Sequence, residues 1–143
     1  ARLAAGDRKG ADAVAAARLK DQPKDVAFLM FLGGAASRVG DEPAAEARYR
    51  QVLAIAPDNA VALNNLAWSL AQQKKPGGLE LAEKANSLVP GQAPFMDTLA
   101  LLLGEANQMQ RALELQQQAV AIAPDVPEMR LRLAALLIKA GNK

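Results

Sequence analysis

The side chains best suited to chemistry in this chain are its single tryptophan and the polar residues beside it. Trp68 follows two amide side chains, Asn64 and Asn65, by about one helical turn. An aromatic anchor flanked by amide donors and acceptors suits an extended peptide, and it also suits a sugar ring. The same residues equally suit a packing role, in which Trp68 fills space between neighbouring helices and the amides bond nearby backbone. Both interpretations stay open at this point.

Catalytic chemistry has few candidates. The chain contains no His and no Cys, so it lacks the usual general base and the thiolate nucleophile. Asp97 and Glu105 lie eight residues apart, which on one helix separates them by about 12 Å, too far to share a substrate proton. The three serines at 37, 69 and 87 have no lysine at a useful spacing. We therefore expect no enzyme activity, no cofactor and no metal site.

Charge and composition exclude further classes. Seventeen basic and 15 acidic residues are interleaved along the 143 positions, and no basic stripe alternates with aromatics, which argues against nucleic acid as a partner. No run approaches the roughly 18 apolar residues that span a bilayer, so we expect no membrane insertion of this segment. The chain begins with Ala and not Met, and we expect a segment cut from a longer protein whose compartment is unknown.

A sequence period reveals the elements that position these side chains. Four prolines, Pro23, Pro57, Pro90 and Pro124, stand 34, 33 and 34 residues apart, and the sequence Ile55–Asp58 recurs at Ile122–Asp125. Such a period is typical of a helical repeat array, in which each unit needs its neighbours to bury its apolar face. Proline ends a helix, so each of these residues closes a unit.

Each unit is expected to hold two helices. The second helix of each complete unit is predicted at about 43–55, 77–88 and 109–122, and an earlier second helix at about 8–21. A turn at Gly6–Asp7 is expected to precede the helix at 8–21. Capping residues are expected to start the first helices, and a small residue lets the partner helix approach closely in each unit. We expect three caps, Asp25, Asn59 and Asp125, and four small residues, Gly33, Ala67, Ala100 and Ala134. The apolar stripes are Leu29/Leu32/Ala36, Leu63/Leu66/Leu70, Met96/Leu99/Leu103 and, with a polar first member, Arg130/Leu133/Leu137.

This pattern resembles the tetratricopeptide repeat. Leu29, Leu32-Gly33, Ala45, Tyr49 and Pro57 match its consensus, whereas a later unit has Gln116 where an aromatic is usual. The resemblance implies an all-α right-handed superhelix of antiparallel helix pairs, with about seven helices after a frayed N-terminal remnant. It implies one array over 1–143: a partial repeat at 1–23, complete repeats at 24–57, 58–90 and 91–124, and the first helix of a further repeat at 125–143.

A narrower resemblance rests on Asn64-Asn65-Leu66-Ala67-Trp68 and Asp97-Thr98-Leu99. These strings are similar to bacterial tetratricopeptide proteins and lipoproteins associated with exopolysaccharide synthesis and export, of the exosortase-linked type. That resemblance implies a periplasmic or outer-membrane-associated location.

The tetratricopeptide resemblance also implies a concave groove lined by first helices. The groove residues expected from helical phase are Met30, Gly34, Arg38, Asn64, Asn65, Trp68, Gln72, Asp97, Thr98, Leu101, Glu105 and Arg132. Some members of the family hold a peptide C-terminus with Lys, Asn and Arg on successive first helices. Here Met30, Gly34, Pro94 and Thr98 replace most of that set, and recognition of chaperone tails is not expected. Glu46/Arg50, Glu80/Lys84 and Glu128/Arg132 are predicted to pair along single helices.

We predict a non-enzymatic scaffold that binds a protein or peptide partner in this groove. The alternative is a regulatory or substrate-presenting segment of a larger enzyme, such as a glycosyl- or sulfotransferase. A further possibility is self-association through the apolar side of the last helix, from Leu131 to Ile138, which sedimentation at several concentrations would detect.

Overall fold

The structure is a computed structural model that describes the backbone of residues 5–141 and the side chains of residues 10–141. Ala1–Ala4, the start of the expected helix tail, lie outside the described residues. Eight α-helices and no strand occupy residues 5–141, which confirms the all-α prediction. The helices are α1 (Ala5–Asp21), α2 (Val26–Arg38), α3 (Glu42–Ile55), α4 (Ala60–Gln72), α5 (Gly78–Leu88), α6 (Ala93–Glu105), α7 (Met109–Ile122) and α8 (Pro127–Gly141).

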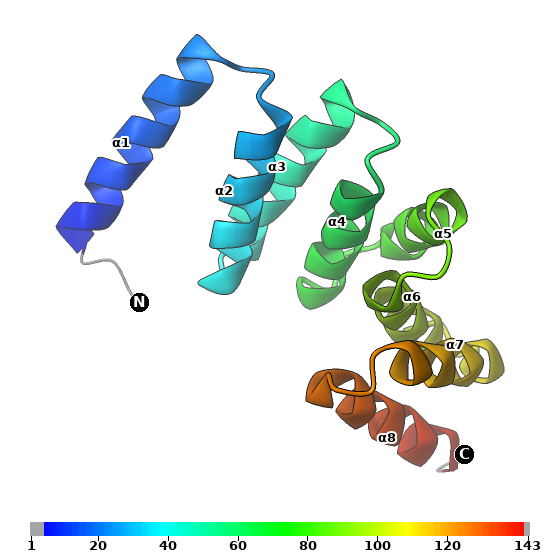
Figure 1. Cartoon of the computed structure of the whole chain (residues 1–143). Coiled ribbons are helices and arrows are strands. Elements are labelled where there is room, and N and C mark those ends of the chain that lie inside the picture. The colour runs from blue at the N-terminus through cyan, green and yellow to red at the C-terminus, as the bar shows by residue number, and fades with distance from the viewer. Residues whose placement is uncertain (1–4, 142–143) are drawn as a thin grey trace.

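The helices form a curved row of antiparallel pairs (Figure 1). Within units, α2 packs on α3, α4 on α5 and α6 on α7, and α3, α5 and α7 each pack on the first helix that follows. The first helices lie along the inner side of the row, where α6 contacts both α4 and α8. At the other end, α1 leans away from α2 and meets it through Arg18, which forms an ion pair with Asp25 at 2.8 Å and covers the Phe28 ring.

Side-chain caps begin several helices where the sequence predicts them. Asp25 and Asn59 accept hydrogen bonds from the backbone amides of Phe28 and Ala62, each at 3.0 Å. Two predicted boundaries are wrong. Gly6 and Asp7 lie inside α1, because a glycine is tolerated within a helix and no proline stops the chain there. Asp125 does not adjoin its helix, because α8 begins at Pro127, whose fixed φ suits a first helical position.

The core runs along the row between the two layers of helices. Leu29, Leu63, Leu66 and Leu99 are buried there, as the apolar stripes predict. Among the described glycines, Gly33 leaves the least room for a side chain. A Cβ atom at this position would lie 2.5 Å from Cε1 of Tyr49, a distance at which the ring would have to shift. The glycine therefore allows the Tyr49 ring of α3 to pack directly on the backbone of α2.

The last helix is covered on one side only. Its buried residues are Met129 and Leu136, which face α7 and α6. Leu137 occupies the place that Leu103 has in α6, yet Leu137 is 50% exposed and Leu103 is 0% exposed. No described helix comes after α8, so the other side of its predicted stripe is bare, and Arg130 and Ala134 are also exposed. This is the surface through which the sequence predicts self-association, and that pairing remains a proposal.

Candidate partner-binding surface

Two groups of side chains lie on the inner side of the row, and both include Trp68. We call the first the Arg132 cluster, formed by Trp68, Asp97, Gln116 and Arg132. We call the second the Trp68 pocket, a hollow of about 340 Å³. Its lining residues come from α2, α3 and α4, and they are Gly34, Ser37, Arg38, Tyr49, Asn65 and Trp68.

The Arg132 cluster ties three first helices together. The Arg132 guanidinium of α8 donates to both carboxylate oxygens of Asp97 in α6, through Nε at 2.8 Å and through Nη2. Its Cζ atom lies 5.4 Å from the centroid of the Trp68 ring in α4, within the range of a cation–π contact. A bidentate pair of this kind fixes the orientation of both side chains. Arg132 therefore pairs with Asp97 and not with Glu128, because the buried acid lies within reach across the helix interface.

Gln116 completes this cluster from the second layer. Its amide nitrogen donates to Oδ1 of Asp97 at 2.7 Å and to the backbone carbonyl of Met129 at 2.9 Å. Asp97 is only 5% exposed, so these bonds compensate the burial of its charge. These hydrogen bonds explain why Gln116 stands where the repeat consensus has an aromatic residue. That departure from the consensus is the sequence signal for the hydrogen bonds among Gln116, Asp97 and Arg132.

Polar and aromatic groups surround the Trp68 pocket. Burial raises the pKa of the Tyr49 phenol, and the hydrogen bond with Asn65 and the charge of Arg38 act in the opposite direction. Ser37 donates its hydroxyl proton to Oε1 of Glu42 at 2.6 Å. The Arg38 guanidinium folds back over Gly34, with Nη1 3.5 Å from the place a Cβ would take there. These groups can offer a ligand several hydrogen-bond donors, one positive charge and an aromatic face.

The other predicted groove residues are dispersed. Asn64 is buried and donates to Oδ1 of Asn65 at 3.4 Å, and Thr98 is buried with its hydroxyl bonded to the carbonyl of Pro94 at 3.1 Å. Met30 and Leu101 are half-buried against core clusters. Gln72 and Glu105 are exposed near the ends of their helices. Of the predicted set, Arg38, Asn65 and Trp68, together with Gly34, meet at one pocket.

Two aromatic residues at this surface were missed from the sequence. Phe31 is 61% exposed on α2 and stacks on Phe28, with ring centroids 6.3 Å apart. It stands one period before Asn65, a relation that could have placed it on the groove face. Tyr49 belongs to a second helix and reaches the pocket only because Gly33 lets its ring pass. That contact depends on tertiary packing, which helical phase alone does not reveal.

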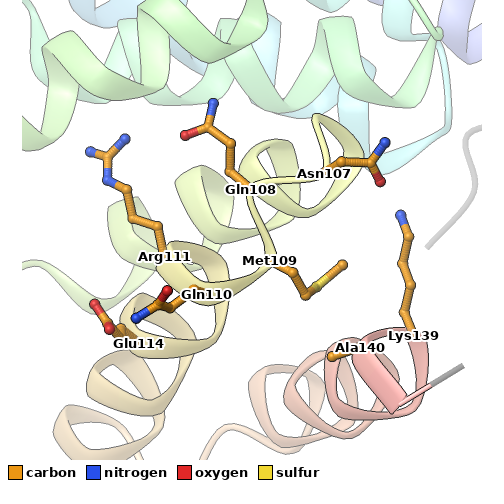
Figure 2. A pocket seen from close by; sticks show the side chains of 8 residues that line it. All are labelled: Asn107, Gln108, Met109, Gln110, Arg111, Glu114, Lys139 and Ala140. Carbon is orange, nitrogen blue, oxygen red and sulfur yellow. The ribbon is translucent and has the colours of Figure 1, made fainter. Parts of the chain in front are cut away.

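A larger hollow of about 770 Å³ lies between the start of α7 and the end of α8 (Figure 2). Arg111, Glu114 and Lys139 contribute charges of both signs to its lining. Arg111 already pairs with Glu83 at 2.6 Å, and the Lys139 ammonium donates to the carbonyl of Gly104 at 3.1 Å. Both basic groups are thus engaged within the protein, and the three charged groups do not converge on a common point (Figure 2).

Among the side chains described, those of residues 10–141, no group of acidic residues is arranged to hold a metal ion. None of the described helices combines the length and apolar character that crossing a bilayer requires.

Comparison with known proteins identifies the fold. The sequence matches no protein-family model and none of the curated proteins. Three solved structures illustrate the similarity. An O-GlcNAc transferase mutant of Thermobaculum terrenum is 29% identical over 78% of this chain, with a TM-score of 0.74, and this chain spans only 22% of its length. A MamA double mutant from RS-1 is 20% identical over 96% of this chain and 78% of its own, with a TM-score of 0.80.

The third structure is the first tetratricopeptide domain of Spaghetti (RPAP3), solved with the HSP90 peptide SRMEEVD. It is 15% identical over 82% of this chain and 94% of its own, with a TM-score of 0.72. At this level of identity the likeness concerns the fold alone. Together with the eight helices and their pairing, these similarities establish that the chain folds as a tetratricopeptide-type helical solenoid.

Proposed function

We propose that this chain is a non-enzymatic scaffold that binds an extended peptide of a partner protein along the inner face between α2 and α4. The observation that carries this proposal is the Trp68 pocket, where an aromatic ring, an amide and a guanidinium converge on one open hollow. Aromatic and arginine side chains in such hollows dominate the energy of protein–peptide recognition. The peptide-bound Spaghetti domain, which has the same fold, adds support.

The proposed binding face narrows the groove expected from the sequence. Arg132 and Asp97 pair with each other, and Asn64 and Thr98 are buried, so we do not expect these four residues to bind the peptide directly. The residues proposed to contact the peptide are Phe31, Arg38, Asn65 and Trp68. We further propose the unit boundaries 24–57, 58–90 and 91–124, supported by the pairs α2–α3, α4–α5 and α6–α7 that fall within them.

A second candidate function is a tetratricopeptide segment within a larger enzyme. It is favoured by the 29% identity to the O-GlcNAc transferase, a protein of which this chain spans 22%. A catalytic domain elsewhere in the full-length sequence would support this candidate. A lipoprotein signal would instead support the exopolysaccharide export scaffold, which rests on the resemblance of residues 64–68 and 97–99 alone.

The scaffold proposal is tested by peptide binding to wild type and to Trp68→Ala. Fluorescein-labelled pools of random nonapeptides serve as probes, and fluorescence anisotropy measures their binding. We expect Trp68→Ala to weaken binding at least ten-fold, because it removes the aromatic wall of the pocket. Ile122→Ala, at an exposed position of the second helix α7, is the matched control and should bind as wild type does. Equal binding by Trp68→Ala and wild type would show that the peptide does not bind at the Trp68 pocket.

A further inference from the structure

The Trp68 pocket has one charged group in its lining, the guanidinium of Arg38. No carboxylate among the described side chains lies within ion-pairing distance of the Arg38 guanidinium. By contrast, Arg18, Arg50, Arg111 and Arg132 each pair with an acid. Arg38 lies in the last turn of α2, where the helix dipole favours a cation but supplies no specific partner.

Gly34 shapes the pocket around this charge. The equivalent places in the next two first helices hold Trp68 and Leu101, so the array has room for a large side chain at position 34. Gly34 differs from Gly33, because a Cβ at Gly34 would meet only Nη1 of Arg38, at the ordinary contact distance of 3.5 Å. A glycine in a helix interior reduces helix stability relative to alanine. Here it leaves the hollow between α2 and Trp68 open and lets the guanidinium lie within it.

The remaining groups complete a site for an anion with an apolar stem. The Tyr49 hydroxyl and the Asn65 amide can donate hydrogen bonds, and the Trp68 ring offers an apolar wall. Glu42, whose charge acts on Tyr49, does not line the pocket: its Oε1 accepts a hydrogen bond from the Ser37 hydroxyl at 2.6 Å, and its Oε2 has almost no exposed surface. The volume of about 340 Å³ lies near the lower limit for small-ligand pockets, and it suits one side chain.

From this geometry we infer that the Trp68 pocket binds a glutamate or aspartate side chain of the partner peptide, with the carboxylate on Arg38 and the stem against Trp68. This inference rests on the proposed function and names the chemistry that the groove selects. It predicts that the pocket recognises the acidic side chain itself, so that a peptide without a free C-terminus should still bind.

The test uses three pools of nonapeptides with acetylated N-termini and amidated C-termini, so that no terminal charge contributes. The central residue is Glu, Gln or Lys, and all other positions are random. Trp68 is the only tryptophan, so its intrinsic fluorescence reports occupancy of the pocket directly. We expect wild type to bind the Glu pool at least ten-fold more tightly than the Gln pool, and the Lys pool most weakly. Higher salt should reduce the difference.

Three variants locate the effect. Arg38→Gln should bind the Glu and Gln pools equally, whereas Arg130→Gln, which removes an exposed arginine from α8, should keep the wild-type preference. Gly34→Leu should fill the hollow and abolish binding of the Glu pool. Because leucine favours helix more than glycine does, the thermal midpoint of Gly34→Leu should not fall below that of wild type. This variant separates loss of the pocket from loss of the fold.

The outcomes distinguish the two proposals. Binding that requires Trp68 but shows no preference for Glu over Gln, or a preference that survives in Arg38→Gln, overturns the carboxylate inference and leaves the scaffold proposal standing. Preference for the Lys pool, or normal binding by a folded Gly34→Leu, also overturns the inference. If wild type binds none of the three pools, the proposed function fails together with it.

Discussion

At the scale of single residues, the structure separates side chains that support the inner face from those that are open to a partner. Asp97 and Arg132 both lie on first helices, which makes them groove candidates in the sequence. In the fold, the two neutralise each other, and Gln116 binds Asp97 from behind. Arg38 and Trp68 instead border an open hollow. The deciding factor is whether a charge has a partner within the protein, and helical phase does not contain that information.

Removal of the buried acid should destabilise the fold. Asp97→Ala would leave the Arg132 guanidinium without its bidentate partner and the Gln116 amide with the Met129 carbonyl alone. Because Arg132 remains partly exposed, we expect a loss of roughly 2–3 kcal/mol in the free energy of unfolding, measured by urea denaturation. Asp58→Ala, which breaks an exposed pair with Lys84, should cost less than about 1 kcal/mol. Similar losses for the two variants would contradict the structural role of Asp97.

Part of the Trp68 pocket could be predicted from the sequence. Arg38, Asn65 and Trp68 follow from helical phase, because a side chain's face depends only on its position along the helix. Tyr49 could not be found in this way, since it comes from a second helix and reaches the pocket across Gly33. The Asp97–Arg132 pair joins residues 35 positions apart and depends on how α6 and α8 approach each other.

At the scale of helices, burial depends on the neighbour that each helix has. Leu103 and Leu137 occupy equivalent places in α6 and α8, and the repeat pattern predicts both positions as apolar. Their exposures differ because the second helix of its own unit, α7, covers Leu103, whereas no second helix follows α8 among the described residues.

Truncation of these two leucines should reveal that difference. Leu103→Ala should cost roughly 2–5 kcal/mol, and the same range applies to the buried Leu66 and Leu99. Leu137→Ala should cost less than about 1 kcal/mol, because half of its surface is already in water. Urea denaturation of each variant measures both values. A small loss at Leu103, Leu66 or Leu99 would mean that the assigned facing of the first helices is wrong.

Helix boundaries were predictable where local signals are strong. Periodic prolines and the caps at Asp25 and Asn59 set most of them, since both act through the chain's own backbone. The start of α1 was not predictable from Gly6–Asp7, because a Gly-Asp pair is compatible with a helix interior as well as with a turn. The helix predicted at about 8–21 therefore begins earlier, as a helix of 17 residues, and seven further helices follow it.

At the scale of the whole molecule, the curved row has two kinds of inner surface. From α4 to α8, Arg132 joins the first helices, and the Asp97 side chain between them is buried. Between α2 and α4, the Trp68 pocket opens and the Phe31 ring is exposed beside Phe28. The array therefore presents its proposed recognition surface at the N-terminal half of the row, while the Arg132 cluster joins the first helices of the C-terminal half (Figure 1).

The most direct test of this account is an NMR titration of the isotope-labelled protein with the tightest-binding peptide from the pools. We predict that the largest chemical-shift changes fall on α2 and α4, at Phe31, Gly34, Arg38 and Asn65 and at the indole N–H of Trp68. The outward faces of α5 and α7 should change little. If the largest changes instead fall on those second helices or on the exposed side of α8, with α2 and α4 unaffected, the inner face is not the binding surface.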